Sequence, residues 1–340
     1  MKINFFLPHL KVAGGVRVIL SYADWLAKNN HQVTVVVQSK SRTRYFFNFL
    51  NIKPSWFKNF NAKIIRIPDW SPKNIPNADI SVIDSWGLVA KNYQLPKEKG
   101  AKFHFIQHDE RLYHGQRNEV DKIYRLPIKK IVVSSWIKEI FKNDYKQDAE
   151  LLLNSFDRSL FYPAEIKKDA KQVRILMLHH NHKWKGTEEW AEIVGELKKK
   201  YKNIKLIMFG VRQKEISNVC DEYYYNLPQH KLAELYSSAD IYLCPSWDEG
   251  SGLPSMEAMA CRCALVTYNN GGSRDYAFDG QTAMVAERRN KEDLKNKLEL
   301  LIKDEELRKK ISTNGFNYIQ NMPTWKEQAE KLENIFKEKL

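Results

Sequence analysis

One stretch near residue 250 constrains the fold of this chain more than any other. Residues 239–243 form an apolar run that predicts a short buried strand, and residues 254–261 predict a helix. The loop between them carries glycines at 250 and 252, which let the backbone approach a ligand closely. The predicted order is therefore strand, glycine-bearing loop and helix.

The start of that predicted helix favours an anionic ligand. Pro254 suits a first helical turn, because the N–H that proline lacks would have no partner there. The free amides of such a turn attract an anion, most often a phosphate. Two carboxylates bracket the turn, Glu249 before it and Glu257 within it, and both can accept hydrogen bonds from hydroxyl groups. A phosphate on the amides and hydroxyls on the acids indicate a nucleotide sugar.

Residues 249–261 read Glu-Gly-Ser-Gly-Leu-Pro-Ser-Met-Glu-Ala-Met-Ala-Cys. This pattern resembles the donor-site motif of the retaining glycosyltransferases of family 4 (glycosyl transferases group 1), and further segments match that family in order over nearly the whole chain. The resemblance implies an α/β GT-B fold, in which two facing Rossmann-like, doubly wound domains hold the active site in the cleft between them. It also implies that Glu249 binds hydroxyls of the donor sugar and that Glu257 binds those of the ribose. The diphosphate would meet the backbone amides of Gly250, Ser251, Gly252 and Leu253.

The length of the chain suits two domains. At 340 residues it is long for a single hydrophobic core. The highly charged stretch 164–171 is the predicted linker. We therefore expect a Rossmann-like acceptor-binding domain at residues 1–163 and a Rossmann-like nucleotide-sugar domain at residues 164–322. In GT-B folds the last helix crosses back onto the first domain, so the resemblance assigns residues 323–340 to it.

Composition excludes several classes of protein. A hydrophobic content of 43% indicates a globular rather than a disordered chain. No apolar run approaches the ~20 residues of a membrane span and no signal peptide is recognisable, so we expect a cytoplasmic protein. The four cysteines are expected to be buried thiols, because the Cys261-x-Cys263 spacing lacks a second ligand pair for zinc.

The positive charge is concentrated in the first half. Residues 1–160 hold 26 lysines and arginines against 14 acidic residues, a net +12 out of +14 for the chain. Within this half, residues 42–60 interleave aromatic and cationic side chains without an acid, which is typical of a segment on an anionic membrane surface. The same aromatics could instead pack against the first sheet, and both interpretations stay open. Without an RNA-binding motif, we expect no nucleic-acid partner.

Two segments of the first half carry candidate site residues. Gly14 and Gly15 lie in the loop between a strand predicted at residues 2–7 and a helix predicted at residues 18–26, without the spacing of a dinucleotide-binding fingerprint. By resemblance they lie beside the donor phosphates and the acceptor. His108 follows another predicted strand, where ligand-binding residues are expected, although a lone histidine is more often structural. The resemblance places it near the transferred sugar, where an imidazole can orient the acceptor.

The second half opens with a basic loop after a predicted strand. The family commonly places an arginine five residues before the lysine of a Lys-Gly pair, and both cations hold the diphosphate. Lys185 fits this lysine, whereas His180 stands in place of the arginine, so the phosphate site is weaker or is completed by Lys183. Histidines 179, 180 and 182 also raise a metal site as an alternative, but no acid or cysteine lies nearby to complete it. The chain contains no Asp-x-Asp pair, so we expect neither a metal nor a cofactor besides the nucleotide sugar as co-substrate.

By resemblance, the nucleobase lies near the turn after a strand predicted at residues 204–209 and near residues 225–228. This assigns Val211, Asn226 and Leu227 to donor binding, in part through their backbone groups. The expected reaction is transfer of a sugar from a nucleotide sugar to a hydroxyl acceptor, with retention at the anomeric carbon.

The basic first half favours a glycan or lipid-linked acceptor in cell-surface glycan synthesis, at the inner face of the cell membrane. Two other classes stay open, a nucleotide-sugar-binding protein without transfer activity and a peripheral membrane-binding module. The presence of Glu249, Glu257, Lys185 and His108 together favours the enzyme, with Glu249, His108 and Lys185 as its catalytic residues.

Overall fold

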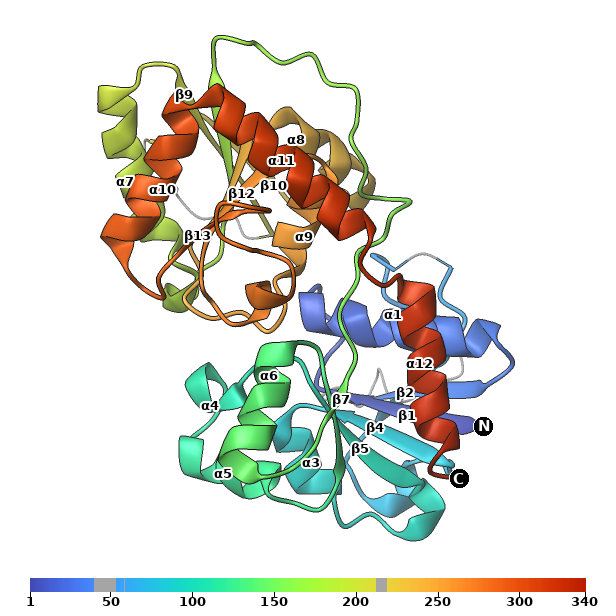
Figure 1. Ribbon diagram of the computed structural model, residues 1–340. Coiled ribbons are helices and arrows are strands. Elements are labelled where there is room, and N and C mark those ends of the chain that lie inside the picture. Colours follow the sequence, from blue (N-terminus) through green and yellow to red (C-terminus); the bar gives the residue numbers. More distant parts are fainter. Residues whose placement is uncertain (40–52, 58, 212–218) are drawn as a thin grey trace. The chain divides into compact units, whose positions relative to one another are not determined.

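The computed structural model describes residues 1–39, 53–57, 59–211 and 219–340. Their contacts divide the chain into two units. The first consists of residues 1–154 and 323–340, and the second of residues 155–322. Each is an α/β unit built on a parallel sheet (Figure 1).

Within the described residues, the first unit holds a seven-stranded sheet in the order β3-β2-β1-β4-β5-β6-β7. Its strands are β1 (Lys2–Leu7), β2 (Gln32–Gln38), β3 (Lys63–Ile67), β4 (Ile80–Asp84), β5 (Ala101–Ile106), β6 (Lys129–Val132) and β7 (Glu150–Leu151). Its α-helices are α1 (Gly14–Lys28), α3 (Trp86–Asn92), α4 (Glu110–Tyr113), α5 (Arg117–Tyr124), α6 (Ser135–Ile140) and α12 (Trp325–Lys337). Shorter helical turns are Pro72–Asn74, Lys97–Lys99 and the π-helical Phe141–Tyr145.

The described part of the second unit holds a six-stranded sheet in the order β10-β9-β8-β11-β12-β13. Its strands are β8 (Val173–Leu178), β9 (Ile204–Gly210), β10 (Glu222–Tyr225), β11 (Ile241–Cys244), β12 (Ala264–Tyr268) and β13 (Met284–Ala286). Its α-helices are α7 (Thr187–Lys200), α8 (Leu232–Ser238), α9 (Leu253–Ala260), α10 (Lys291–Lys303) and α11 (Glu305–Gln320). Its 3-10 turns are Lys183–Lys185, Gln229–Lys231 and Gly272–Asp275.

The central strands are continuous apolar runs because helices cover both faces of each sheet. In β1, Phe5 and Phe6 are adjacent and both fully buried, although successive side chains of a strand point to opposite faces. Phe6 packs in a cluster with Val36 and Ile83. Burial on both faces therefore fixes β1 at the centre of the first sheet.

The last helix, α12, belongs to the first unit. It begins with a capping box between Thr324 and Glu327, a device that satisfies two of the free amides at a helix start. It lies beside α1 (Figure 1), and the ring of Trp325 contacts Tyr22 of α1 at 5.3 Å. Near its other end, Phe336 contacts Phe103 of β5 at 5.2 Å. The helix thus completes the hydrophobic core on one face of the first sheet.

The division between the units falls after Asn154, whereas the sequence placed the domain boundary after residue 163. The intervening segment packs on the second unit. Phe161 is buried and its ring contacts Tyr236 at 6.0 Å, while Arg158 donates to the carbonyl oxygens of Gln320 and Met322. These contacts hold residues 155–163 on the second unit, ahead of the charged stretch expected to be the linker.

Helix α1 begins earlier than the sequence predicted. The amide of Arg17 already donates to the carbonyl of Ala13 at 3.0 Å, so Gly14 and Gly15 form the first helical turn instead of a loop. The prediction that the helix begins at residue 18 was wrong, because glycine has a low intrinsic preference for helix.

The four cysteines are thiols packed in the second unit. Cys244, Cys261 and Cys263 are buried, and Cys220 is partly buried. Burial raises the pKa of each thiol, and that of Cys261 reaches about 12. All four are therefore protonated near neutral pH and serve as small apolar side chains.

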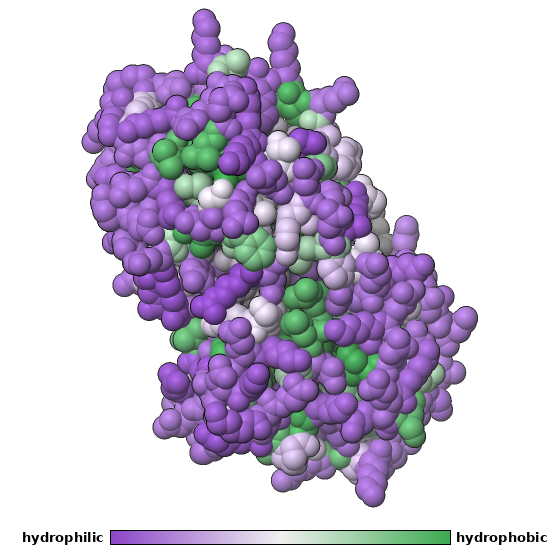
Figure 2. Space-filling model, viewed as in Figure 1, coloured by the Kyte–Doolittle hydropathy of each residue, from purple (hydrophilic) through white to green (hydrophobic). Residues whose placement is uncertain are grey.

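None of the described helices combines the length and the apolar character of a membrane span. The face drawn in Figure 2 is mainly hydrophilic, with hydrophobic residues in small separate areas.

Most of the basic aromatic segment 42–60 lies outside the described residues, namely 42–52 and 58. Its described end packs on the protein. The indole of Trp56 donates to the carbonyl of Leu10 at 3.1 Å, and the ring of Phe57 contacts the buried Phe60. For these aromatics the packing interpretation is the appropriate one.

Candidate active site

A pocket opens at the carboxyl edge of the second sheet. Strands β8, β9 and β10 follow one another to one side, and the chain then returns to the other side of β8 with β11. Open α/β sheets bind ligands at such a switch point, because the loops after the two central strands diverge there. The pocket is lined by Leu178, His180, Lys185, Tyr242, Leu243, Cys244, Pro245, Ser246, Glu249, Gly252, Pro254 and Ser255.

The loop after β8 brings Lys185 to this pocket. It ends in the 3-10 turn Lys183–Lys185, and Gly186 then takes a left-handed conformation (φ 65°) to start α7. A Cβ atom on Gly186 would lie 2.7 Å from the carbonyl oxygen of Pro245, so glycine lets the two loops approach closely. The amide of Trp247 also donates to the carbonyl of Trp184 at 2.8 Å. The loops after β8 and β11 are thus joined by their backbones.

Lys185 and Glu249 meet across these two loops. The lysine Nζ lies 2.6 Å from the Oε1 atom of Glu249, and both side chains are partly exposed. The backbone of Glu249 is held from the other side, since its amide donates to Asn270 and its carbonyl accepts from Gly272. A cation and a carboxylate are therefore presented together in one wall of the pocket.

The glycine-bearing loop turns sharply into α9. Gly252 has a φ of 80°, and a Cβ atom there would lie 2.5 Å from the Tyr276 hydroxyl oxygen. That hydroxyl donates to the carbonyl of Ser251 at 2.9 Å and fixes the turn. Glu257 is buried one turn inside α9, where its Oε2 atom accepts from the Tyr236 hydroxyl at 3.2 Å. The helix start and the second motif glutamate thus have fixed positions.

Asp248 anchors this loop, and its role was not predicted from the sequence. Asp248 is fully buried beside Glu249 and forms ion pairs with both Arg288 and Arg289. The guanidinium of Arg289 also lies over the ring of Trp247, 4.9 Å from its centre. In the sequence the two adjacent arginines look like any solvated pair, so only the structure connects them with the loop.

The remaining donor-site candidates do not line the pocket. Lys183 is exposed in the turn before Lys185, and Gly250, Ser251 and Leu253 lie in the loop and first turn that lead into α9. Val211 follows β9, and the amide of Asn226, which precedes Leu227, donates to Gly210 at 2.7 Å. Val211, Asn226 and Leu227 therefore gather at the carboxyl ends of β9 and β10.

The histidines of the β8 loop contact other side chains of the second unit. His179 Nδ1 lies 2.9 Å from the hydroxyl of Tyr223, and His182 stacks on Trp184 at 4.1 Å with its ring 4.5 Å from that of His180. In the chain as described, no group of three or more histidine, cysteine, aspartate or glutamate side chains is arranged to hold a metal ion.

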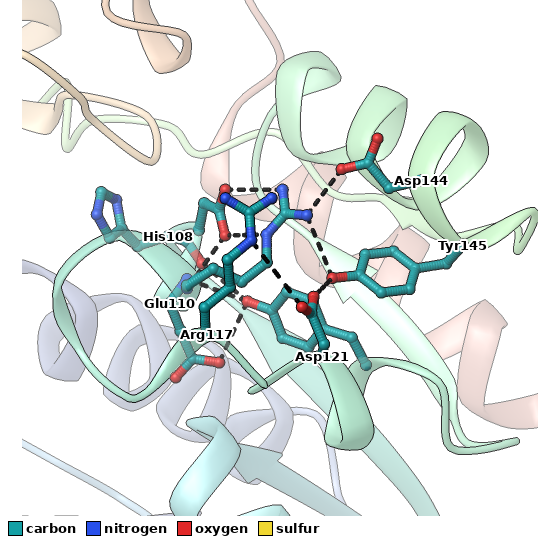
Figure 3. Close-up of polar contacts among 9 residues, drawn as sticks. His108, Glu110, Arg117, Asp121, Asp144 and Tyr145 are labelled. Atoms are coloured by element: carbon teal, nitrogen blue, oxygen red, sulfur yellow. Dashed lines mark hydrogen bonds and ion pairs between the residues drawn. The ribbon is translucent and has the colours of Figure 1, made fainter. Parts of the chain in front are cut away.

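In the first unit, His108 lies between β5 and α4. Its ring stacks on Tyr113 at 5.9 Å. The next residue, Asp109, receives two hydrogen bonds from the buried guanidinium of Arg111, which also donates to Asp144 and Tyr145. Figure 3 shows the imidazole of His108 directed away from this network.

The side chain of Arg111 stays positively charged in this network. Burial lowers the pKa of Arg111, but its bonds to Asp109 and Asp144 outweigh burial and raise that pKa above its usual value. A charged Arg111 bound to two carboxylates ties the segment after β5 to the π-helical turn that holds Asp144. The network therefore fixes the backbone at His108.

Comparison with known proteins finds a family match that lies within the second unit. The sequence profile of the family "Glycosyl transferases group 1" matches residues 160–318. The capsular polysaccharide biosynthesis glycosyltransferase CapM of Staphylococcus aureus is 27% identical over 162 residues, which cover 45% of this chain and 42% of CapM. The chain spans about half the length of the curated relatives it matches.

Solved structures share the architecture of both units. The sucrose-phosphate synthase of Thermosynechococcus elongatus has a TM-score of 0.81 at 15% identity, covering 99% of this chain and 98% of that one. Anabaena Alr3699/HepE, solved with UDP and glucose, has a TM-score of 0.77 at 13% identity, covering 99% of this chain and 100% of that one. Residues 160–318 therefore match the family of glycosyl transferases group 1, and the chain as a whole shares the GT-B fold.

Proposed function

We propose that this protein is a retaining, metal-independent glycosyltransferase that moves a sugar from a nucleotide sugar to a hydroxyl acceptor. The observation that carries the proposal is the pocket at the carboxyl edge of the second sheet, where Lys185 and Glu249 form one wall. The family match covers this unit, and a protein of the same fold was solved with UDP and glucose. A nucleotide sugar offers a diphosphate to the lysine and hydroxyls to the carboxylate.

The donor diphosphate is assigned to the basic side of the pocket. Lys185 would stabilise the negative charge that develops on the leaving diphosphate, and His180 lines the same pocket. Lys183 is close in sequence and adds positive charge to this loop. The amides of residues 250–253, at the start of α9, would face the same phosphates.

The carboxylates are assigned to the neutral parts of the donor. Glu249 would accept hydrogen bonds from hydroxyls of the transferred sugar. Glu257, oriented by the Tyr236 hydroxyl, would accept those of the ribose. Val211, Asn226 and Leu227 would contact the nucleobase at the neighbouring strand ends.

Retention and metal independence come from the family resemblance. On that basis the leaving phosphate takes the acceptor proton on the same face of the sugar, so the reaction needs neither a separate base nor a divalent ion. His108 would orient the acceptor from the first unit.

The acceptor is proposed to be a precursor of a cell-surface glycan, at an anionic membrane. Two observations support this proposal. One relative, CapM, is named for capsular polysaccharide biosynthesis, and residues 1–160 carry a net charge of +12. We expect the protein to sediment with vesicles containing phosphatidylglycerol and to be released by salt. Equal binding to neutral phosphatidylcholine vesicles, or none to either, would contradict membrane attachment by charge.

The decisive experiment follows release of the nucleoside diphosphate from nucleotide sugars. Replacing Lys185 by alanine should lower kcat by about 10²–10³-fold, because the charge on the leaving group loses its partner. Lys205→Ala is the matched control, since this exposed lysine lies at the amino end of β9, opposite the pocket edge. EDTA should leave the wild-type rate unchanged. Full activity in Lys185→Ala, or loss of activity with EDTA, would contradict the proposal.

A further inference from the structure

The first sheet has a switch point of its own, and the proposed function gives it no carboxylate. Strands β1, β2 and β3 follow one another to one side, and β4 returns to the other side of β1. The carboxyl ends of β1 and β4 therefore flank the edge at which open α/β sheets bind ligands. Asp84 is the last residue of β4, and Gly15 lies in the helical turn that follows β1.

One amide joins these strand ends. The Nε2 atom of Gln107, just beyond β5, donates to Asp84 Oδ1 at 2.9 Å and to the carbonyl oxygen of Gly15 at 3.0 Å. A Cβ atom on Gly15 would lie 3.0 Å from that amide, so glycine permits the close approach. Gln107 also precedes His108 in the chain. Asp84 is thereby placed beside both first-unit segments that the sequence singled out.

Asp84 lacks the surroundings of a structural carboxylate. Asp24, which is structural, receives the amide and side chain of Asn61 and pairs with Lys28 at 2.8 Å. Asp84 is partly exposed and receives the neutral amide of Gln107, and in the described part of the chain no cation forms an ion pair with it. Asp84 is therefore able to accept a further hydrogen bond from a ligand hydroxyl.

Removal from water, with a smaller effect of a nearby charge, makes Asp84 hard to ionise. Burial raises the pKa of this carboxyl, the Gln107 hydrogen bond lowers it, and the negative charge of Glu110 raises it; together they bring the pKa to about 7. Glu110 is held in place, because both of its carboxylate oxygens accept from the amide of Trp86 at the start of α3. An anionic ligand would be repelled by this pair of acids, whereas an uncharged hydroxyl would not.

The backbone beside Asp84 is strained. Ser85 has a φ of 73°, a left-handed conformation that residues other than glycine rarely adopt. Such strain gathers at ligand-binding positions, where the surrounding structure enforces it. Here it turns the chain from β4 into α3 directly after the carboxyl.

We propose that Asp84 is the acceptor-binding carboxyl of the first unit, and that it accepts a hydrogen bond from an uncharged hydroxyl of the acceptor. This inference rests on the proposed glycosyl transfer. It predicts that the reacting end of the acceptor is a sugar or polyol hydroxyl without a neighbouring negative charge.

The test compares the wild type with Asp84→Asn and Asp79→Asn. Asp79 precedes β4 at the opposite end of the strand, where its carboxylate accepts from the amide of Lys2 at 2.6 Å. The acceptor probes are water and octyl β-D-glucoside, with a nucleotide sugar that binds the wild type. We expect Asp84→Asn to keep the wild-type Kd and KM for the donor, to lose roughly tenfold or more in kcat, and to unfold at no lower temperature at alkaline pH. Asp79→Asn should keep its kcat.

Two results would overturn the assignment. A wild-type kcat in Asp84→Asn would show that the carboxyl does not contact the acceptor. A clear fall in unfolding temperature at alkaline pH would identify it as a structural residue. Failure of the wild type to bind any nucleotide sugar would instead contradict the proposed function itself, so the two failures are distinguishable.

Discussion

The two sheets of this chain have the same kind of ligand-binding edge but equip it with different charges. In the second unit the edge holds Lys185 against Glu249, a cation beside a carboxylate. In the first unit it holds Asp84, bridged by the neutral amide of Gln107 and facing Glu110. The backbone topology is shared, so the side chains decide the ligand. A diphosphate would suit Lys185 and Glu249 in the second unit, and an uncharged hydroxyl would suit Asp84 in the first.

The largest predicted effect concerns the pH dependence of stability at the first edge. The pKa of Asp84 is raised in the folded protein, so its contribution to stability is present at low pH and is lost as the pH rises through about 7. The loss has an upper bound of roughly 4 kcal/mol. Asp84→Asn should therefore gain stability relative to the wild type between about pH 4 and about pH 8, measured by thermal unfolding at both values. A constant difference at the two pH values would contradict the account of this edge.

A second, smaller effect tests whether the second edge depends on close backbone approach. Gly252→Ala adds a Cβ atom 2.5 Å from the Tyr276 hydroxyl at a φ of 80°. Strain and clash together should cost about 3 kcal/mol of unfolding free energy. Gly280 is the matched control, because its φ is 65° but a Cβ atom there meets nothing within 4 Å. Gly280→Ala should cost only about 1–2 kcal/mol in denaturant unfolding, and equal costs for the two variants would contradict the argument from close approach.

The smallest predicted effect tests whether the stability of the first unit can change without a change in turnover. Thr324→Ala removes the capping box of α12, which packs beside α1, and should cost about 1 kcal/mol. Because Thr324 contacts neither Asp84 nor Gln107 among the described contacts, donor cleavage by the folded variant should keep its wild-type kcat. A large loss of turnover at unchanged folding would show that the edge depends on this helix.

The sequence predicted the central strands because their apolar runs are continuous. The strand at residues 2–7 was predicted with the bounds that the structure has, and those at residues 204–209 and 239–243 correspond to β9 and β11 within two residues. The edge strands β3, β10 and β13 were not predicted, since they are short and their positions depend on pairing with a neighbour. Local pattern thus locates the buried centre of each sheet better than its margins.

The candidate site divides in the same way. The motif placed Lys185 and Glu249 in one site although 64 positions separate them, and both line the pocket. Asp84 and Asp248 carried no sequence signal, because their character comes from partners 23 and 40 positions away, Gln107 and Arg288. Arginines neutralise Asp248, whereas among the described residues no cation pairs with Asp84. Only the fold distinguishes the two carboxylates.

The measurement that most directly tests the central claim is a thermal-shift screen of the purified protein against UDP-, GDP-, dTDP- and ADP-sugars, with and without EDTA. We predict that the sugars of one nucleotide raise the unfolding temperature. At a hundredfold excess of donor over Kd, binding should add about 2.7 kcal/mol to the free energy of unfolding. EDTA should leave the shift unchanged. Lys185→Ala should reduce that shift. No shift with any of the four donors, or a shift that EDTA abolishes, would contradict a metal-independent nucleotide-sugar site at the edge of the second sheet.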